Sequence, residues 1–144
     1  MDRILDRLWL GDAQDANAYA DPTTQHYPVR AILTICEAKP IVHASVQHVH
    51  APIPDEVFLP APVWGELLHC LGGLLWGAHR GHVLVHCRLG VSRSPALVAA
   101  YLAVCGHSRD PEWALAYMLA RRRAIKPHGE TMRGVYTYWE GRHA

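Results

Sequence analysis

Five residues separate Cys87 from Arg93, and this run lies between an apolar, strand-like segment at 83–85 and a helix-like segment that starts at Ser94. Backbone N–H groups of a tight loop before a helix converge on one point, and the positive end of the helix dipole favours an anion there. A sulfur held at that point is favoured as the nucleophilic thiolate. The planar fork of Arg93 matches two oxygens of a phosphate group. The pattern therefore predicts hydrolysis of phosphate monoesters through a cysteine nucleophile, with no cofactor.

The predicted phosphate-binding residues form one continuous loop: Cys87, Arg88, Leu89, Gly90, Val91, Ser92 and Arg93. Ser94 has a hydroxyl that can donate to the sulfur as it leaves, although a hydroxyl at this place is equally suited to cap the helix. His86 is expected to hold the loop and to influence the thiol, without acting as a base. Taken alone, a cysteine at a strand end is more often an inert buried thiol, so the prediction depends on the joint spacing.

The elements that must position this loop follow from hydrophobic patterns and chain-breaking residues. Strands are predicted at 8–10, 30–36, 45–51 and 82–87, and helices at 13–19, 63–79, 94–105, 111–123 and 128–140. Asp12 and Asp110 are expected helix caps, and Gly106 is an expected left-handed helix stop. The segment 82–87 is too apolar for a sheet edge. Alternating strands and helices predict an α/β fold, a single domain over 1–144 whose central, largely parallel sheet is flanked by helices on both faces.

Composition excludes several other classes of protein. The chain has 144 residues, half of them apolar, and a formal net charge of +1, which gives no bulk attraction to nucleic acid or to a membrane. It contains no apolar run of about 18 residues for a membrane span, and no apolar export signal near the N-terminus. The four cysteines form no CxxC pair, so we expect reduced thiols and a cytoplasmic location. We expect a monomer that binds phosphate or a similar oxyanion in the loop.

Eleven histidines raise the question of a metal site. His48 and His50 share one face of a predicted strand, and His82 and His86 form a second pair. Neither pair has a third ligand at a suitable spacing, so no metal is predicted.

The run from His86 to Ser94 resembles the phosphate-binding loop of the cysteine-dependent protein tyrosine phosphatases. The rest of the chain resembles the compact dual-specificity branch of that superfamily. Four further segments carry the resemblance in the expected order: 4–13, 31–36, 122–127 and 138–140. The resemblance implies the compact tyrosine-phosphatase-like fold and a phosphocysteine intermediate on Cys87. It also implies substrates that are proteins phosphorylated on tyrosine and on serine or threonine.

A departing alkoxide needs a proton, so a general acid must face the leaving oxygen. The resemblance places such an acid in a loop ahead of the nucleophile, and the proline-bounded loop at 52–62 contains Asp55 and Glu56. We favour Asp55 over Glu56, and a merely solvated loop acid is the alternative. Asp55 is expected to protonate the leaving group and then to activate the water that hydrolyses the phosphocysteine.

Two departures from the resembled family bear on function. Leu89 and Val91 give the loop an apolar rim where lipid-directed relatives often carry lysines, which favours phosphoproteins over phosphoinositides. The segment 126–129 stands where many relatives have an asparagine. Cys36 closes a predicted strand next to the loop. A buried thiol that fills the core is its favoured role, and the resemblance adds a reversible disulfide with oxidised Cys87.

Two other functions remain as alternatives. One is hydrolysis of a non-protein phosphate ester, such as a phosphoinositide, a sugar phosphate or an RNA 5′ end. The other is a catalytically silent phosphate-binding module, which would lack the nucleophile, the acid or the arginine. Cys87, Asp55 and Arg93 are all present, so we favour the enzyme.

Overall fold

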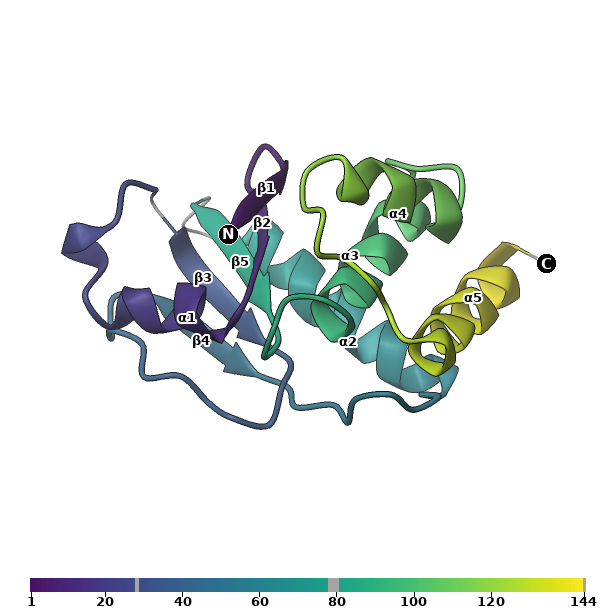
Figure 1. Ribbon diagram of the computed structural model, residues 1–144, viewed down its shortest axis with the longest axis horizontal. Helices are drawn as coiled ribbons and strands as arrows, with labels where there is room; N and C mark the ends of the chain where they lie inside the picture. The colour runs from purple at the N-terminus through teal and green to yellow at the C-terminus, as the bar shows by residue number, and fades with distance from the viewer. Residues whose placement is uncertain (28, 78–80, 144) are drawn as a thin grey trace.

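A five-stranded sheet forms the centre of the described part of the chain (Figure 1). The computed structural model describes residues 1–27, 29–77 and 81–143. In sheet order the strands are β1 (Asp2–Leu5), β2 (Leu8–Gly11), β5 (His82–His86), β3 (Val29–Thr34) and β4 (Gln47–His50). β1 and β2 are antiparallel, and the other pairings are parallel. The predicted, largely parallel sheet is confirmed, with β5 in its middle.

β5 is apolar because both of its faces are buried. Val83 and Val85 lie in the larger core cluster, whereas Leu84 points to the opposite face and lies in a second cluster. Strands covered on both faces have such continuous apolar runs. β5 has a hydrogen-bonded neighbour on each side, and its carboxyl end leads directly into the predicted phosphate loop. The loop therefore starts from the central strand of the sheet.

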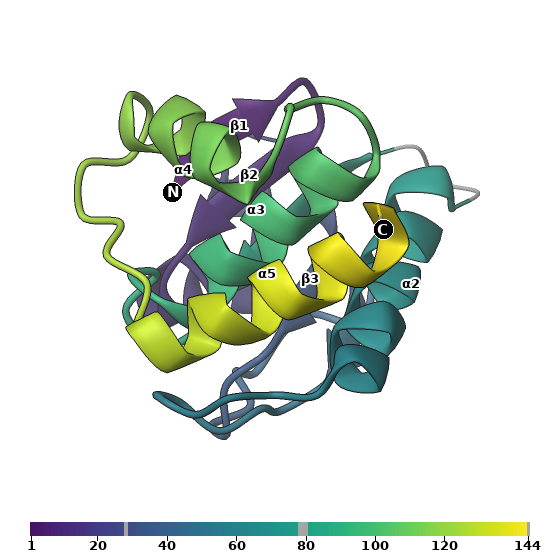
Figure 2. The ribbon, with the colours of Figure 1, turned by 90° about the vertical axis from the view of Figure 1, so that its right-hand side faces the viewer.

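Helices cover the two faces of the sheet unequally. One face carries α2 (Ala61–Trp76), α3 (Arg93–Val104), α4 (Pro111–Leu119) and α5 (Gly129–His143). The other face carries α1 (Ala13–Asn17) and the 3-10 helix η1 (Ala18–Ala20). Figure 1 shows α1 on one side of the sheet and α2 to α5 on the other. In Figure 2, α3 lies between the sheet and the outer helices, in agreement with its contacts to α2, α4 and α5. The prediction of helices on both faces is confirmed.

Three predicted helix ends are also confirmed. Asp12 caps α1 in a capping box, in which the Asp12 and Asp15 side chains accept from each other's backbone N–H. Asp110 caps α4 by accepting from the N–H of Trp113. Gly106 follows α3 with a φ of +80°, the left-handed conformation that glycine adopts without strain.

Several predicted boundaries are wrong. The helix predicted to reach 123 ends at Leu119, because the chain then turns back toward the phosphate loop, where Lys126 N–H donates to the Val91 carbonyl. The short edge strand β1 was not predicted, since Ile4 is its one fully buried side chain and so short a segment shows no apolar pattern. The observed ranges of the other shifted elements are 8–11, 13–17, 29–34, 47–50, 61–76, 82–86, 93–104 and 129–143. The predicted end of the 63–79 helix falls outside the described residues.

No helix in the described ranges has both the length and the apolar character needed to cross a membrane.

Candidate active site

The carboxyl ends of three parallel strands bring the predicted site residues to one edge of the sheet. β5 leads into the phosphate loop, β3 into the segment with Cys36 and Glu37, and β4 into the segment with Asp55. These segments and the chain before α5 enclose a cavity of about 580 Å³. Its lining residues are Glu37, Asp55, Glu56, Cys87, Arg88, Leu89, Val91, Ser92, Arg93, Lys126, Pro127, His128 and Gly129.

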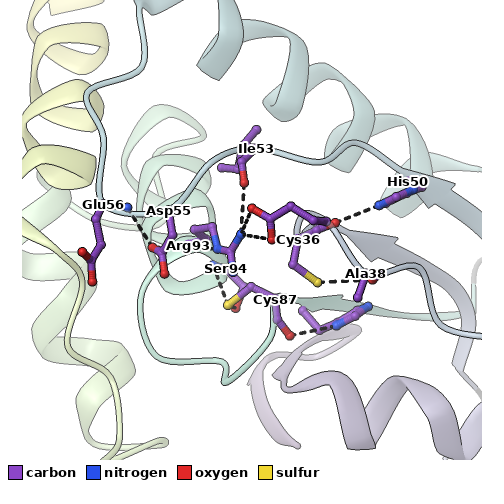
Figure 3. Close-up of polar contacts among 11 residues, drawn as sticks. Cys36, Ala38, His50, Ile53, Asp55, Glu56, Cys87, Arg93 and Ser94 are labelled. Carbon is purple, nitrogen blue, oxygen red and sulfur yellow. Dashed lines mark hydrogen bonds and ion pairs between the residues drawn. The ribbon is translucent and has the colours of Figure 1, made fainter.

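Ser94 lies directly against the predicted nucleophile (Figure 3). Cys87 lines the cavity although only 2% of the residue is exposed. Ser94 Oγ is 3.2 Å from Cys87 Sγ, and the Ser94 backbone N–H donates to the same sulfur at 3.5 Å. Two donors directed at the sulfur stabilise negative charge on it. The alternative role of Ser94 as a helix cap is wrong, because α3 begins at Arg93 and Ser92 occupies the N-cap position.

The backbone carbonyls of residues 87–91 are each bonded by a group outside that run. In order along the chain, the five carbonyls accept from His86 Nδ1, from Ala13 N, twice from the Arg122 guanidinium and from Lys126 N, at distances of 2.8–3.3 Å. Across a planar peptide bond the following N–H points opposite to the carbonyl. The N–H groups of residues 88–92 are therefore turned to the other side of the loop, where they can converge on an oxyanion.

Arg122 is a support that the sequence interpretation missed. The arginines at 121–123 end a predicted helix and have no predicted role in the site. Instead, Arg122 Nε donates to the Gly90 carbonyl at 3.0 Å, and its Nη1 contacts Asp2 Oδ2 at 2.8 Å. The side chain of Arg122 is therefore held between the phosphate loop and the first strand.

The segment 126–129 supports the loop through its backbone. Lys126 N–H donates to the Val91 carbonyl at 2.8 Å, and His128 N–H donates to Ser92 Oγ at 2.9 Å. Backbone amides do not depend on the side chain at their position. The segment therefore supports the loop without the asparagine that is common in the resembled family.

Arg93 is held by an acid that the sequence interpretation did not identify. Its Nη1 donates to Glu37 Oε1 and Oε2 at 3.0 and 2.9 Å and to the Ile53 carbonyl at 3.0 Å. Burial lowers the pKa of Arg93, but the hydrogen bond to Glu37 and the charge of Asp55 outweigh it, so this pKa lies above its ordinary value. One pattern that could have revealed Glu37 is its position directly after a strand that neighbours β5, where carboxyl ends meet.

Asp55 faces Arg93, as the predicted acid should. Asp55 Oδ1 is 3.8 Å from Arg93 Nε and also accepts the Glu56 backbone N–H at 2.9 Å. In Figure 3, Asp55 lies between Glu56 and Arg93. Glu56 lines the same cavity, with a φ of +59°, the left-handed conformation. The geometry favours Asp55 over Glu56.

His86 stands at the end of a buried hydrogen-bond chain. Its Nδ1 is 3.0 Å from the Cys87 carbonyl, and an acceptor there requires a proton on Nδ1. Burial lowers the pKa of His86, which favours the neutral ring. Nε2 of that ring must then accept from Thr34 Oγ1 at 2.7 Å, and Thr34 Oγ1 must accept from His48 Nε2 at 2.7 Å. Both nitrogens of His86 are engaged, so the ring holds the loop rather than serving as a base.

Cys36 is buried in the same core cluster as Cys87. Its thiol donates to the Ala38 carbonyl at 3.5 Å, and burial raises the pKa of Cys36. All four cysteines are free. In the described residues, no three His, Cys, Asp or Glu side chains are grouped so that they could hold a metal ion.

The sheet order and the loop that leaves its central strand define a tyrosine-phosphatase-like fold. The sequence profile of the family described as dual specificity phosphatase, catalytic domain, matches residues 8–140, and the chain belongs to this family. The structure is similar to that of the human tyrosine phosphatase-like serine/threonine/tyrosine-interacting protein, with a TM-score of 0.87 and 26% identity over 100% of this chain and 98% of that one. Human DUSP28 has the same fold, with a TM-score of 0.83 and 19% identity over 99% and 98% of the two chains.

Curated relatives match a shorter segment. The tyrosine-protein phosphatase yvh1 of Schizosaccharomyces pombe is 43% identical over 58 residues, which are 40% of this chain and 17% of that protein. A protein phosphatase Slingshot homolog of Xenopus laevis is 41% identical over 61 residues, which are 42% of this chain and 9% of that protein. The matched segment is therefore less than a fifth of the length of either relative.

Proposed function

We propose that this protein is a cysteine-dependent dual-specificity phosphatase that hydrolyses phosphotyrosine and phosphoserine or phosphothreonine in proteins. One observation carries the proposal. The carboxyl group of Asp55 lies around one cavity with the sulfur of Cys87 and the guanidinium of Arg93, which belong to a loop whose carbonyls at 87–91 are bonded from outside that run. Such a site binds a phosphate dianion and presents both a nucleophile and an acid to it.

In the first half of the reaction, the Cys87 thiolate attacks phosphorus and the bond from phosphorus to the leaving oxygen breaks. Asp55 gives its proton to that oxygen, so the product leaves as an alcohol or phenol and a phosphocysteine remains. Arg93 and the loop amides bind the three equatorial oxygens, where charge is spread in the transition state.

In the second half, water attacks the phosphocysteine. The Asp55 carboxylate accepts a proton from that water, the bond between sulfur and phosphorus breaks, and inorganic phosphate is released. The Ser94 hydroxyl, 3.2 Å from the sulfur, donates to the departing thiolate. Asp55 is thereby protonated again for the next turnover.

The rim of the cavity favours a protein substrate. Leu89 is 66% exposed and Val91 also lines the cavity, so apolar surface surrounds the phosphate position. Such surface can pack against the residues that flank a phosphorylated side chain. Faster hydrolysis of a phosphoinositide, a sugar phosphate or an RNA 5′ end than of phosphotyrosine peptides would overturn this preference.

Turnover of p-nitrophenyl phosphate tests the nucleophile. We expect Cys87→Ser to abolish turnover, while Cys105→Ser, which changes an exposed cysteine outside the cavity, keeps it. Appreciable activity of Cys87→Ser would show that the nucleophile is misassigned. Iodoacetate should likewise inactivate the wild type, and phosphate should protect it.

The leaving group tests the acid. p-Nitrophenolate departs easily without a proton, whereas the alkoxide of phosphoserine does not. Asp55→Asn should therefore lose more activity on a phosphoserine peptide than on p-nitrophenyl phosphate. Equal losses on both substrates would contradict the role of Asp55 as a proton donor.

The burial of Cys36 supports its favoured role as a thiol that fills the core. A protective disulfide with Cys87 stays a prediction. Peroxide would oxidise the Cys87 thiolate to a sulfenic acid, and the Cys36 thiol would displace water from it to form the disulfide. Mass spectrometry after mild peroxide treatment tests this, since absence of the crosslink would exclude the disulfide. A nucleophilic thiol also needs reducing surroundings, which supports the proposal of a cytoplasmic enzyme. We also propose that the enzyme acts as a monomer.

A further inference from the structure

Asp2 lies on the edge strand of the sheet, yet it bonds the arginine that supports the phosphate loop. Its Oδ2 accepts from Arg122 Nη1 at 2.8 Å, although the two residues are 120 positions apart in the sequence. The Arg122 side chain is 12% exposed and that of Asp2 is 39% exposed. Neither is among the described residues that line the cavity. The pair can therefore act on a bound oxyanion through the loop or through its charge, but not by contact.

The guanidinium of Arg122 has one edge toward the loop and a third nitrogen toward Asp2. Nε donates to the Gly90 carbonyl at 3.0 Å, and Nη2 donates to the Leu89 carbonyl at 3.3 Å. These two nitrogens point the same way in the planar group, so one edge serves two successive carbonyls. Nη1 has Asp2 as its bonded acceptor in the described part of the chain. A charged acceptor therefore holds the group from behind, and two neutral acceptors receive its edge.

Asp2 is a firm anchor because two neighbours fix the backbone of β1. Asp2 pairs with Leu10 of β2, and the hydroxyl of Tyr117 on α4 donates to the Ile4 carbonyl at 2.8 Å. A long arginine side chain loses much rotamer freedom when it is held in one geometry. A carboxylate on a fixed strand selects that geometry of Arg122 before a substrate arrives.

The two carbonyls that Arg122 bonds determine where two loop amides point. Across planar peptide bonds, the N–H groups of Gly90 and Val91 point opposite to the Leu89 and Gly90 carbonyls. Donors that hold these carbonyls outward therefore hold both N–H groups toward the oxyanion. If Arg122 turns away, these two amides are no longer aimed.

Removal of Asp2 also has an opposite effect, through charge. The Asp2 carboxylate offsets the positive charge of Arg122, and an unpaired guanidinium near the loop would attract a dianion. Water and salt screen such an attraction where the charges are partly exposed and touch no ligand. The amides contact the oxyanion directly, so their orientation is not screened in this way. The structure therefore favours the orienting effect as the larger of the two.

We propose that Asp2 is a positioning residue, which holds Arg122 in the orientation that keeps the Leu89 and Gly90 carbonyls turned outward. This inference rests on the proposed function, because the loop in question is the phosphate site of that enzyme. It differs from a purely structural role, since it predicts weaker oxyanion binding in protein that is still folded.

The experiment is a double-mutant cycle of Asp2→Ala and Arg122→Met, with Asp2→Asn and Asp6→Ala beside it. Asp6 is an exposed residue in the turn between β1 and β2 and, within the described ranges, has no hydrogen-bonded partner. We expect Asp2→Ala to weaken calorimetric binding of tungstate, a phosphate analogue, by about threefold to fivefold. The kcat/KM for p-nitrophenyl phosphate should fall by a similar factor. Asp2→Asn keeps an acceptor and should lose less, and Asp6→Ala should match wild type.

The Arg122→Met background isolates the route through the arginine. There, Asp2→Ala should have no further effect on tungstate affinity, because the group that Asp2 positions is gone. An equal loss in both backgrounds would show that Asp2 acts independently of Arg122, and would overturn the proposal.

Three other results bear on the proposal. Tighter tungstate binding by Asp2→Ala would overturn it, because the effect of charge would then be the larger one. A lower urea midpoint with unchanged tungstate affinity of the folded protein would also overturn it, leaving Asp2 a structural role. If wild type binds tungstate but turns over no phosphate ester, the proposed function fails, and the cycle of tungstate affinities still decides the role of Asp2.

Discussion

Gly90→Ala should damage this protein more than any ordinary glycine replacement, because two separate costs fall on this position. Gly90 has a φ of +68°, in the left-handed region. For a residue with a Cβ this conformation costs about 1–2 kcal/mol. A Cβ at Gly90 would also lie 2.6 Å from the carbonyl oxygen of Gly11, which is backbone at the end of β2 and has little freedom to move. Overpacking of this kind costs about 1–3 kcal/mol more.

Gly106 provides a matched control. Its φ is +80°, so alanine there carries the same conformational cost, but nothing lies within 4 Å of its Cβ position. We expect Gly106→Ala to destabilise by about 1 kcal/mol and Gly90→Ala by about 3 kcal/mol. The difference between the two losses of unfolding free energy measures the cost of the contact between the phosphate loop and the end of β2.

Urea unfolding of the two variants measures this difference. With a slope of about 1–3 kcal/mol/M, an extra 2 kcal/mol lowers the midpoint by about 1 M. Under folding conditions, Gly90→Ala should also bind tungstate more weakly than Gly106→Ala, since the displaced loop no longer aims its amides. Equal midpoints would refute the reasoning, because the clash with the Gly11 carbonyl would then have no cost.

Three further predictions concern the supports of the loop. Thr34→Val should lower the free energy of unfolding in urea by about 1–3 kcal/mol, because it leaves His86 and His48 without the hydroxyl that bonds both rings. An unchanged free energy of unfolding would contradict this hydrogen-bond chain. Burial lowers the pKa of His86 in the folded protein, so below the ordinary pKa of 6.5 the unfolded chain binds more protons than the folded one, and stability should fall as the pH decreases through that value. His86→Asn should flatten this dependence when unfolding is measured at pH 7.5 and 5.5. An unchanged pH dependence would exclude His86 as its source. Arg122→Met should weaken tungstate binding measured by calorimetry, because two loop carbonyls lose their donor, whereas Arg121→Met, beside it but not bonded to the loop, should not; equal effects would refute this role.

The parts of the fold that the sequence predicted are those set by local chemistry. The apolar run of β5 requires two covered faces, and the side chains of Asp12 and Asp110 cap helices within three residues of themselves. Gly106 stops α3 because its own backbone adopts a positive φ. In each case the cause and the structure lie within one short segment.

The elements that were missed depend on distant residues. The edge strand β1 has four residues, and its neighbour β2 positions it: Arg3 pairs with Trp9 and stacks over its ring at 5.0 Å. The helix predicted to reach 123 ends early because Arg122 is drawn to the phosphate loop. The hydrophobic pattern of one segment does not show contacts with distant residues, so helix propensity alone predicts a helix that is too long.

The same distinction applies to the site itself. The loop sequence determines which residues face the phosphate, but its own atoms do not keep five successive carbonyls turned outward. The donors that do so come from β5, α1 and the segment between α4 and α5, and the acid that orients Arg93 comes from the segment after β3. Each of these partners replaces water that would otherwise compete for a carbonyl or for the guanidinium. A chain with the same loop residues but without those donors would bind an oxyanion only after paying the conformational entropy of ordering the loop. The phosphate site is therefore a property of the assembled sheet edge, which is why the loop motif predicted its chemistry but neither Glu37 nor Arg122.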